Sequence, residues 1–289
     1  MKAIVNGKLI LKDRIVEGKA LLYTDVIEGI VDADKVPADA EIIDAAGKYV
    51  APGLIDLHIH GYLGKDVCDG SVESMRTICE GIVKNGVTGF LPTTMTVSMD
   101  VIIKALETCR SLMEESKTWN GTTILGVHAE GPFINTKKKG AQNPEYILVP
   151  SAEFVKEYAD VIRIISLAPE MDENFKEITK MRKETDVVVS MGHTDADYDT
   201  AMEAFRNGAS HATHLYNGMP SIHHRAPAVI GAAFDSPSVR AELICDGVHI
   251  HGAIVRFTFQ LFGKERMVEN IPKKDQCNYK TNGKNRTTY

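Results

Sequence analysis

Two histidines one residue apart stand at the end of an apolar run, in Leu54-Ile55-Asp56-Leu57-His58-Ile59-His60-Gly61. Side chains alternate along a β-strand, so His58 and His60 share one face of such a strand and the aliphatic residues take the other. Paired imidazoles at a strand end are typical ligands of a divalent metal. The pair alone is equally consistent with two interpretations: a metal site, or an exposed strand that carries two histidines by chance.

Three further polar residues each end an apolar run of their own. They are Glu130 in His128-Ala129-Glu130, His193 in Met191-Gly192-His193 and His214 in Ala212-Thr213-His214. Each one alone is more simply interpreted as a buried polar group with a satisfied hydrogen bond. If the runs are parallel strands of one barrel, however, all five side chains meet at the same rim. One carboxylate and four imidazoles suit Zn²⁺ or Fe²⁺, with room for two ions if Glu130 bridges them.

The elements that must position these residues follow from the hydrophobic pattern. Buried runs alternate with amphipathic stretches at roughly 30-residue intervals, which is typical of repeated βα units. The pattern therefore predicts an α/β fold, a (β/α)₈ barrel of the TIM type whose active site lies at the carboxyl ends of the strands. The predicted strands are 49–60, 87–92, 122–130, 161–168, 187–193, 211–214 and 240–246, and the clearest helices are 72–85, 99–115 and 196–207, the last two capped by Ser98 and Asp195.

The two ends of the chain differ in pattern from the barrel region. Residues 1–51 contain short β-like runs broken by turn residues, which predicts part of a small β-sandwich module. The barrel is expected over 52–268. Pro272 ends any strand, and residues 269–289 read as an irregular tail rich in Lys, Asn and Thr. We therefore expect the eighth barrel strand to be missing or degenerate.

Composition limits the classes of function. A net charge of −6 and a pI near 5.9 provide no basic face for nucleic acid, and no apolar run is long enough to span a membrane. The N-terminus has no signal-peptide pattern. Five dispersed cysteines without a C-x-x-C spacing fit a reducing compartment. These features predict a cytoplasmic protein.

Several motifs together resemble the N-acetylglucosamine-6-phosphate deacetylase family of the amidohydrolase superfamily. The resemblance extends from the first residues to about Val268, and it implies a barrel with a β-sandwich and hydrolysis of the sugar acetamide to glucosamine 6-phosphate and acetate. It makes Glu130, His193 and His214 the principal metal ligands, and His58 and His60 match the family members that hold a second ion. The matching runs are 52–61, Glu130-Gly131-Pro132-Phe133, Lys139-Gly140-Ala141-Gln142-Asn143-Pro144, Gly192-His193-Thr194, 213–219 and 245–249.

The same resemblance implies the substrate contacts. Arg225 and His249 would bind the phosphate, because guanidinium and imidazole donors match a phosphate dianion. In the family the arginine reaches across a dimer interface, which implies a homodimer or a higher homo-oligomer. From the residues alone, Arg225 is better interpreted as part of a solvated loop. The implied contact residues are Ala141, Gln142, Asn217, Gly218, Arg225 and His249.

The family's catalytic aspartate has no counterpart in a matching strand. It would serve as general base toward water and general acid toward the amine. Asp275 lacks the apolar strand that would aim it, so the catalytic residue stays unassigned and we expect weak activity from a truncated or frame-altered chain. The alternatives are an amidohydrolase acting on a cyclic amide and a non-catalytic remnant that binds metal or sugar phosphate.

Overall fold

The computed structural model describes residues 1–270 and contains two compact units. The first unit comprises Met1–Leu54 and the second begins at Ile55. The predicted module ended at residue 51. Each unit has its own sheets, and the polar residues of interest all belong to the second.

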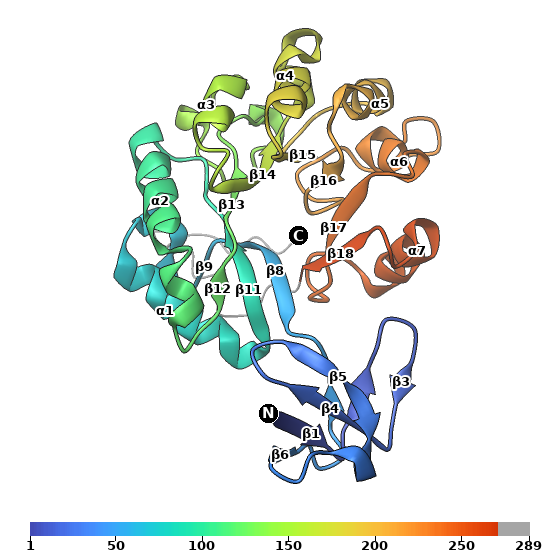
Figure 1. The fold of residues 1–289 in the computed structure, drawn as a ribbon. Coiled ribbons are helices and arrows are strands. Elements are labelled where there is room, and N and C mark those ends of the chain that lie inside the picture. The colour runs from blue at the N-terminus through green and yellow to red at the C-terminus, as the bar shows by residue number, and fades with distance from the viewer. Residues whose placement is uncertain (271–289) are drawn as a thin grey trace. The chain divides into compact units, whose positions relative to one another are not determined.

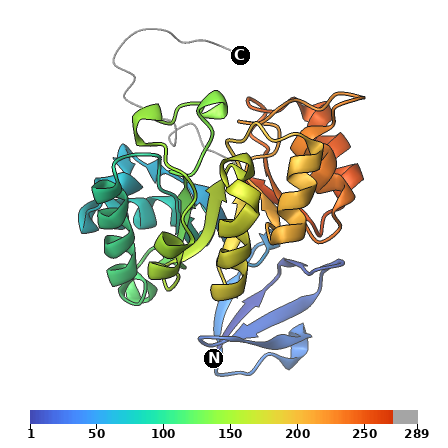
Figure 2. The ribbon, with the colours of Figure 1, turned by 90° about the horizontal axis from the view of Figure 1, so that it is seen from above.

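The N-terminal unit is built from strands alone, apart from one short 3₁₀ turn. Its strands form a four-stranded sheet of order β5-β4-β1-β6 and a three-stranded sheet of order β3-β2-β7, seen in blue in Figure 2. Alternation along β4 buries Ala20 and Leu22 between half-buried neighbours. The strands are β1 (Lys2–Val5), β2 (Lys8–Ile10), β3 (Ile15–Val16), β4 (Lys19–Tyr23), β5 (Ile27–Asp32), β6 (Glu41–Asp44) and β7 (Tyr49–Val50).

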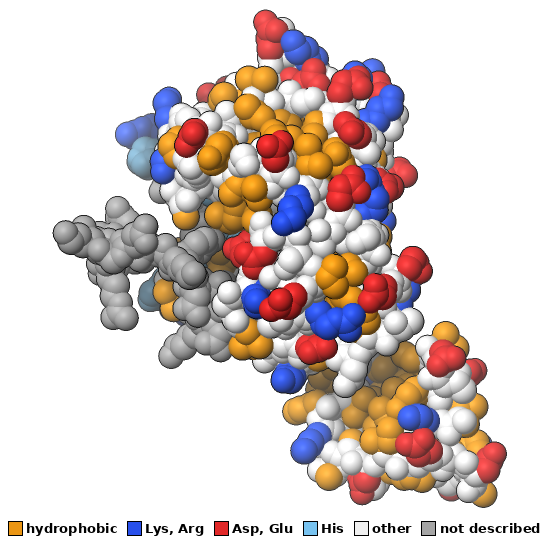
Figure 3. Space-filling model, turned by 90° about the vertical axis from the view of Figure 1, so that its left-hand side faces the viewer, with side chains coloured by type: hydrophobic (Ala, Val, Ile, Leu, Met, Phe, Trp, Pro, Cys, Tyr) orange, Lys and Arg blue, Asp and Glu red, His pale blue; other side chains and the backbone are white. Residues whose placement is uncertain are grey.

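This unit leaves much apolar surface exposed. The lower part of Figure 3 shows hydrophobic side chains gathered on one of its faces. Val26 and Ile27, in and before β5, are 64% and 70% exposed, and Ile42 of β6 is 53% exposed. With a core of few buried residues, the unit relies on its backbone hydrogen bonds more than the barrel does.

The second unit is the predicted barrel, and its strands surround a common centre in Figure 1. A six-stranded parallel sheet runs in the order β13-β14-β15-β16-β17-β18, and β8 pairs with β11 in a second sheet. A parallel bridge between Thr93 and His128 joins the two sheets. The strands are β8 (Leu54–Ile59), β11 (Val87–Pro92), β12 (Thr123–Ile124), β13 (Val127–Glu130), β14 (Ile162–Leu167), β15 (Val188–Met191), β16 (His211–Ala212), β17 (Arg240–Ile244) and β18 (Met267–Asn270), with a small hairpin of β9 (Gly61–Tyr62) and β10 (Lys65–Asp66).

Helices alternate with the strands and lie outside them in Figure 1. Each buries one apolar stripe, as α1 does with Met75, Ile78 and Ile82. None of the helices within residues 1–270 is long and apolar enough to cross a bilayer. The helices are α1 (Val72–Ile82), α2 (Met99–Leu112), α3 (Ala152–Glu157), α4 (Lys176–Glu184), α5 (Tyr198–Asn207), α6 (Ala228–Asp235) and α7 (Gly252–Phe262).

Two details of the predicted barrel are corrected by the structure. A short eighth strand, β18, pairs in parallel with β17 and extends to Asn270, where an irregular tail was predicted from residue 269. Residues 267–270 carry too short an apolar run to be recognised as a strand. Asp275 and the rest of the predicted tail, 271–289, lie outside the described residues.

The N-cap of α5 is the second correction. Asp197 accepts a hydrogen bond from the backbone N–H of Thr200, whereas the predicted cap, Asp195, forms ion pairs with Lys137 and Lys138. Two aspartates in the sequence satisfy the capping pattern equally well, so the choice depends on where the loop from β15 turns. The pKa of Asp197 is lowered by its bonds to Thr200.

We predict that Asp197→Ala lowers the free energy of unfolding by about 1 kcal/mol, because it leaves an N-terminal amide of α5 without its acceptor. Asp195→Ala removes only solvent-exposed ion pairs and should change it by less than about 0.5 kcal/mol. Urea unfolding of both variants measures the difference. Equal losses in the two variants would contradict the cap seen here.

Candidate metal centre

The five residues predicted as ligands converge at the carboxyl ends of their strands. Their centre is the Glu130 carboxylate, which closes β13 and is 2% exposed. Its Oε1 lies 3.3 Å from His58 Nε2, 3.3 Å from His193 Nε2 and 3.0 Å from His214 Nε2. Its Oε2 lies 3.3 Å from His60 Nε2. Four imidazoles therefore present the same nitrogen to one carboxylate.

The spacing of these donor atoms fits a divalent ion. Ligands held at about 2.0 to 2.1 Å around a tetrahedral Zn²⁺ lie about 3.3 Å from one another. His214 Nε2 is 3.1 Å from His193 Nε2, and His58 Nε2 is 3.3 Å from His60 Nε2. Two imidazole lone pairs at that distance repel unless a proton or a cation lies between them.

The donors separate into two groups that share Glu130. One contains Glu130, His193 and His214, and the other contains His58, His60 and Glu130. In each group the ligand atoms lie within 4.8 Å of one another. A carboxylate that offers one oxygen to each group can bridge two ions.

Burial and charge set the protonation of the centre. Burial raises the pKa of Glu130, but the neighbouring His58 and His193 hold it well below its usual value. Burial lowers the pKa of His58, but Glu130 and Glu242 raise it well above its usual value. The pKa of His193 is raised in the same way by Glu130, while burial keeps that of His214 low. The carboxylate is therefore ionised, and its negative charge favours positive charge among the ligands around it.

Hydrogen bonds outside the centre orient the ligands. His193 Nδ1 donates to the carbonyl oxygen of Lys138 at 2.8 Å, which leaves Nε2 for the centre. Glu130 Oε2 accepts from Gln142 Nε2 at 2.7 Å, and Gln142 Oε1 accepts from the backbone N–H of Thr96 at 2.6 Å. Both polar ends of the Gln142 side chain are thus engaged in holding Glu130.

The backbone at two of the ligands is in the left-handed region. His193 has φ 49° and His214 has φ 30°, and Tyr216 follows with φ 77°. Such conformations cost of order 1 to 3 kcal/mol and are found preferentially at functional sites. At His214 the strand ends and the chain turns at once, so the imidazole points across the rim.

The predicted substrate residues are only partly brought to this centre. Gln142 lies in it, and Asn217 and Gly218 follow His214 directly, whereas Ala141 is exposed. Arg225 lies on an exposed loop, with its Nη1 2.8 Å from His224 Nε2. His249 Nδ1 contacts Asp246 Oδ2 at 2.7 Å on another exposed loop. The solvated loop that the residues alone predicted for Arg225 is confirmed for this chain.

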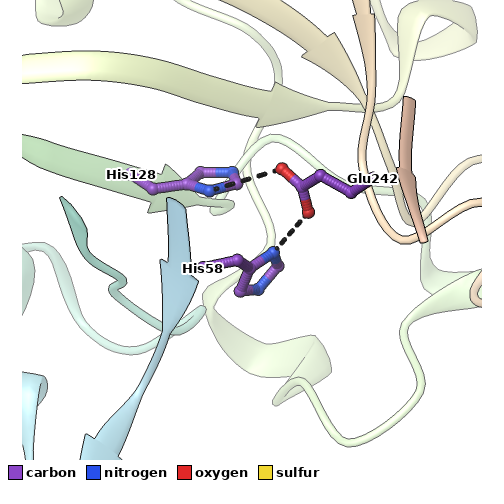
Figure 4. A group of neighbouring side chains, drawn as sticks. All are labelled: His58, His128 and Glu242. Atoms are coloured by element: carbon purple, nitrogen blue, oxygen red, sulfur yellow. Dashed lines mark hydrogen bonds and ion pairs between the residues drawn. The ribbon is translucent and has the colours of Figure 1, made fainter. Parts of the chain in front are cut away.

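Two residues beneath the centre complete it. His128 donates through Nδ1 to the Leu57 carbonyl and contacts Ser166 Oγ through Nε2, so both of its ring nitrogens have partners inside the barrel. Glu242, in the middle of β17, contacts His58 and was missed. Figure 4 shows His58 and His128 both directed toward the Glu242 carboxylate. Alternation along β17 places Glu242 inward with Ala241 and Leu243 on the opposite face, and this was the available signal.

Gly218 limits the space beside the ligands, and its substitution gives a test. An added Cβ at Gly218, where φ is +60°, would lie 3.1 Å from His193 Nδ1 and 3.3 Å from His214 Cε1. At Gly140, with a similar φ of +56°, a Cβ would meet His193 Cε1 at an ordinary 3.5 Å. We predict that Gly218→Ala lowers the metal bound per chain, whereas Gly140→Ala, which carries the same backbone strain, does not. Elemental analysis of both variants decides the point, and equal metal contents would show that crowding of His193 is unimportant.

Comparison with known proteins places this geometry in a family. The model of the amidohydrolase family matches residues 49–281. The chain is 38% identical to N-acetylglucosamine-6-phosphate deacetylase of Bacillus subtilis (strain 168), over 81% of this chain and 60% of that protein. It is 33% identical to the protein of the same name from Haemophilus influenzae, over 90% of this chain and 68% of the relative.

Solved structures agree. The crystal structure of N-acetylglucosamine-6-phosphate deacetylase from Pasteurella multocida superimposes with a TM-score of 0.85 at 33% identity, covering 93% of this chain and 70% of the other. The chain spans 60% of the length of the Bacillus subtilis relative. With a family model that covers most of its length and a barrel rim that carries the Glu130 and histidine set, the chain belongs to the amidohydrolase family.

Proposed function

We propose that the protein is a metal-dependent deacetylase that hydrolyses the acetamide of N-acetylglucosamine 6-phosphate to glucosamine 6-phosphate and acetate. The observation that carries the proposal is the buried Glu130 carboxylate with four imidazole nitrogens at 3.0 to 3.3 Å. The relatives named for this reaction support the choice of substrate.

Glu130, His193 and His214 would hold one ion, and His58 and His60 would complete a second position with Glu130. Zn²⁺ or Fe²⁺ suits a set of imidazoles and one carboxylate. A divalent ion in such a site supplies Lewis acidity toward water and toward an amide carbonyl. The protein's own contribution is to keep Glu130 ionised through the neighbouring His58 and His193, and to orient the ligands. Hydrogen bonds to the carbonyl oxygens of Lys138 and Thr93 orient His193 and His60, and Gln142 holds Glu130.

The sugar phosphate would lie across the rim from this centre. Asn217 and Gly218, which follow His214, would contact the sugar from one side, and Ala141 and Gln142 from the other. Both polar ends of the Gln142 side chain are already bonded, Nε2 to Glu130 and Oε1 to the backbone N–H of Thr96. Gln142 would therefore contact the substrate while its amide group still holds Glu130.

Arg225 and His249 are the proposed phosphate partners. Arg225 stands on an exposed loop whose described contacts are with His223 and His224, so a second copy of the chain could receive its guanidinium. We therefore propose a homodimer or a higher homo-oligomer in which Arg225 of one copy completes the site of another.

Metal content tests the ligand set. We predict that Glu130→Gln and His193→Ala each lower the metal bound to the purified protein severalfold, because each removes a donor from the group with His214. Glu153→Gln, which alters an exposed carboxylate on α3, is the matched control and should leave the metal unchanged. Elemental analysis of the three variants, with circular dichroism to establish folding, provides the measurement. An undiminished metal content in both variants would refute the assignment of Glu130 and His193 as ligands.

Affinity for the phosphate tests the substrate. We predict that N-acetylglucosamine 6-phosphate binds more tightly than N-acetylglucosamine, and that Arg225→Ala removes roughly ten- to a hundredfold of that preference, since a charge-assisted contact contributes about 1.5 to 3 kcal/mol. Arg206→Ala, at an exposed arginine paired with Glu203 on α5, controls for the loss of a positive charge. Calorimetric titration with both sugars gives the ratio, and equal binding of the two sugars would refute the proposed substrate.

A further inference from the structure

A layer of buried polar side chains lies directly beneath the candidate metal centre. Its middle is Glu242 of β17, which is fully buried. Glu242 Oε2 is 2.8 Å from His58 Nδ1, and its Oε1 is 3.8 Å from His128 Nδ1 and 3.7 Å from His211 Nδ1. Figure 4 shows His58 and His128 pointing toward this carboxylate from β8 and β13. Three imidazoles around a carboxylate could in principle hold an ion of their own.

The hydrogen bonds of His128 argue against an ion here. Its Nδ1 lies 2.9 Å from the carbonyl oxygen of Leu57, which can only accept, so Nδ1 carries a proton. A neutral imidazole with its proton on Nδ1 accepts through Nε2, here from Ser166 Oγ at 2.7 Å. Neither nitrogen of His128 has a lone pair left for a metal.

A chain of hydroxyl groups connects His128 to His211, and the donor at each hydrogen bond follows from the one before it. Because Ser166 donates to His128, it accepts from Thr213 Oγ1 at 2.5 Å, and Thr213 accepts in turn from Ser190 Oγ at 2.6 Å. Ser190 then accepts from His211 Nδ1 at 2.9 Å. The protons of His128 and His211 are therefore committed to neighbours other than Glu242.

His58 is thus the histidine that Glu242 serves. Its Nδ1 lies at hydrogen-bond distance from Glu242 Oε2, and Oε1 of the same carboxylate has no hydrogen-bond partner among the described residues. An ionised carboxylate can only accept, so Nδ1 of His58 must carry the proton. The other nitrogen, Nε2, then faces Glu130 Oε1 and His60 Nε2, both at 3.3 Å.

We propose that Glu242 is a positioning residue that fixes the proton of His58 on Nδ1, so that the Nε2 lone pair is available to the second ion, the one held by His58, His60 and Glu130. The proposal rests on the ligand set given above. The side chains of the other group do not depend on Glu242 in this way: His193 is oriented by the carbonyl oxygen of Lys138, and Glu242 contacts His214 only at its backbone N–H, at a long 3.4 Å. Loss of Glu242 should therefore remove one ion selectively and leave the other.

The test compares two substitutions at one position with a control in the same layer. Glu242→Gln keeps the shape and an acceptor oxygen, and Glu242→Leu removes the acceptor. We expect the affinity of the second zinc ion to fall about 10- to 100-fold in the glutamine variant and the second ion to be absent from the leucine variant, with the first ion retained in both. Ser190→Ala removes a buried hydroxyl that touches neither His58 nor Glu242, and it should keep both ions.

A second measurement does not depend on metal content. In ¹⁵N-histidine spectra, His58 should show a slowly exchanging Nδ1 proton, with and without zinc, that is kept in Ser190→Ala and lost in Glu242→Leu. The signal is assigned with His58→Asn. If the leucine variant does not fold, the glutamine variant and the wild-type spectrum still decide the matter.

The outcomes separate this inference from the proposed ligand set. Two zinc ions of unchanged affinity in both folded Glu242 variants, or a His58 whose Nδ1 carries no proton, would overturn the role of Glu242. A wild-type protein that binds one ion or none would refute the second metal position instead. In that case, an Nδ1 proton present in the wild type and absent from Glu242→Leu would still support the bond between Glu242 and His58.

Discussion

An ionised carboxylate buried among imidazoles is the constraint that the barrel rim must satisfy. Taking such a charge out of water costs several kcal/mol unless partners compensate. Glu130 is compensated by His58 and His193, which carry the opposite charge when no cation is bound, and by the amide of Gln142. The partners come from β8, β15 and the loop that contains Gln142, so the carboxylate is satisfied only when the barrel is assembled. The centre therefore links local chemistry to the global fold.

The parallel strands deliver these partners without long connections. Each ligand stands at or just past the end of its strand, where the backbone turns into a loop, and the bridge between Thr93 and His128 joins the two sheets beside them. Below the rim the inward side chains are small hydroxyls and imidazoles that satisfy one another from β13 to the end of β16. The hydrogen bonds of such a layer determine which atom of each hydroxyl or imidazole pair carries the shared proton.

The sequence predicted most of the barrel because its strands are continuous apolar runs. The limits of β11 match the prediction, and Glu130, His193 and His214 were identified because each terminates such a run. The fold that these runs predicted and the family that the motifs resemble are confirmed by the match to the amidohydrolase family and by the structural neighbours. The short strand β18 and the cap at Asp197 were not predicted, since four residues give no period and two aspartates satisfy one pattern.

Glu242 shows what single-residue patterns cannot reveal. It stands within an apolar run, and nothing about its neighbours in sequence indicates a partner 184 positions away at His58. Its significance depends on the barrel fold, which brings β8 and β17 close together although they lie far apart in the sequence. Likewise, the exposure of His249 follows from a loop path that no periodicity encodes.

The left-handed backbone at His193 and His214 restricts which ligands the rim can evolve. Among residues with side chains, histidine, asparagine and aspartate enter that region most readily, while β-branched residues do so at high cost. Exchange of either histidine for aspartate would keep a donor in an accessible conformation, whereas cysteine or glutamate would add strain to the loss of the imidazole. The backbone conformation at His193 and His214 therefore favours side chains with nitrogen or oxygen donors, whichever ion binds. Metals that prefer thiolate ligands are disfavoured at these two positions.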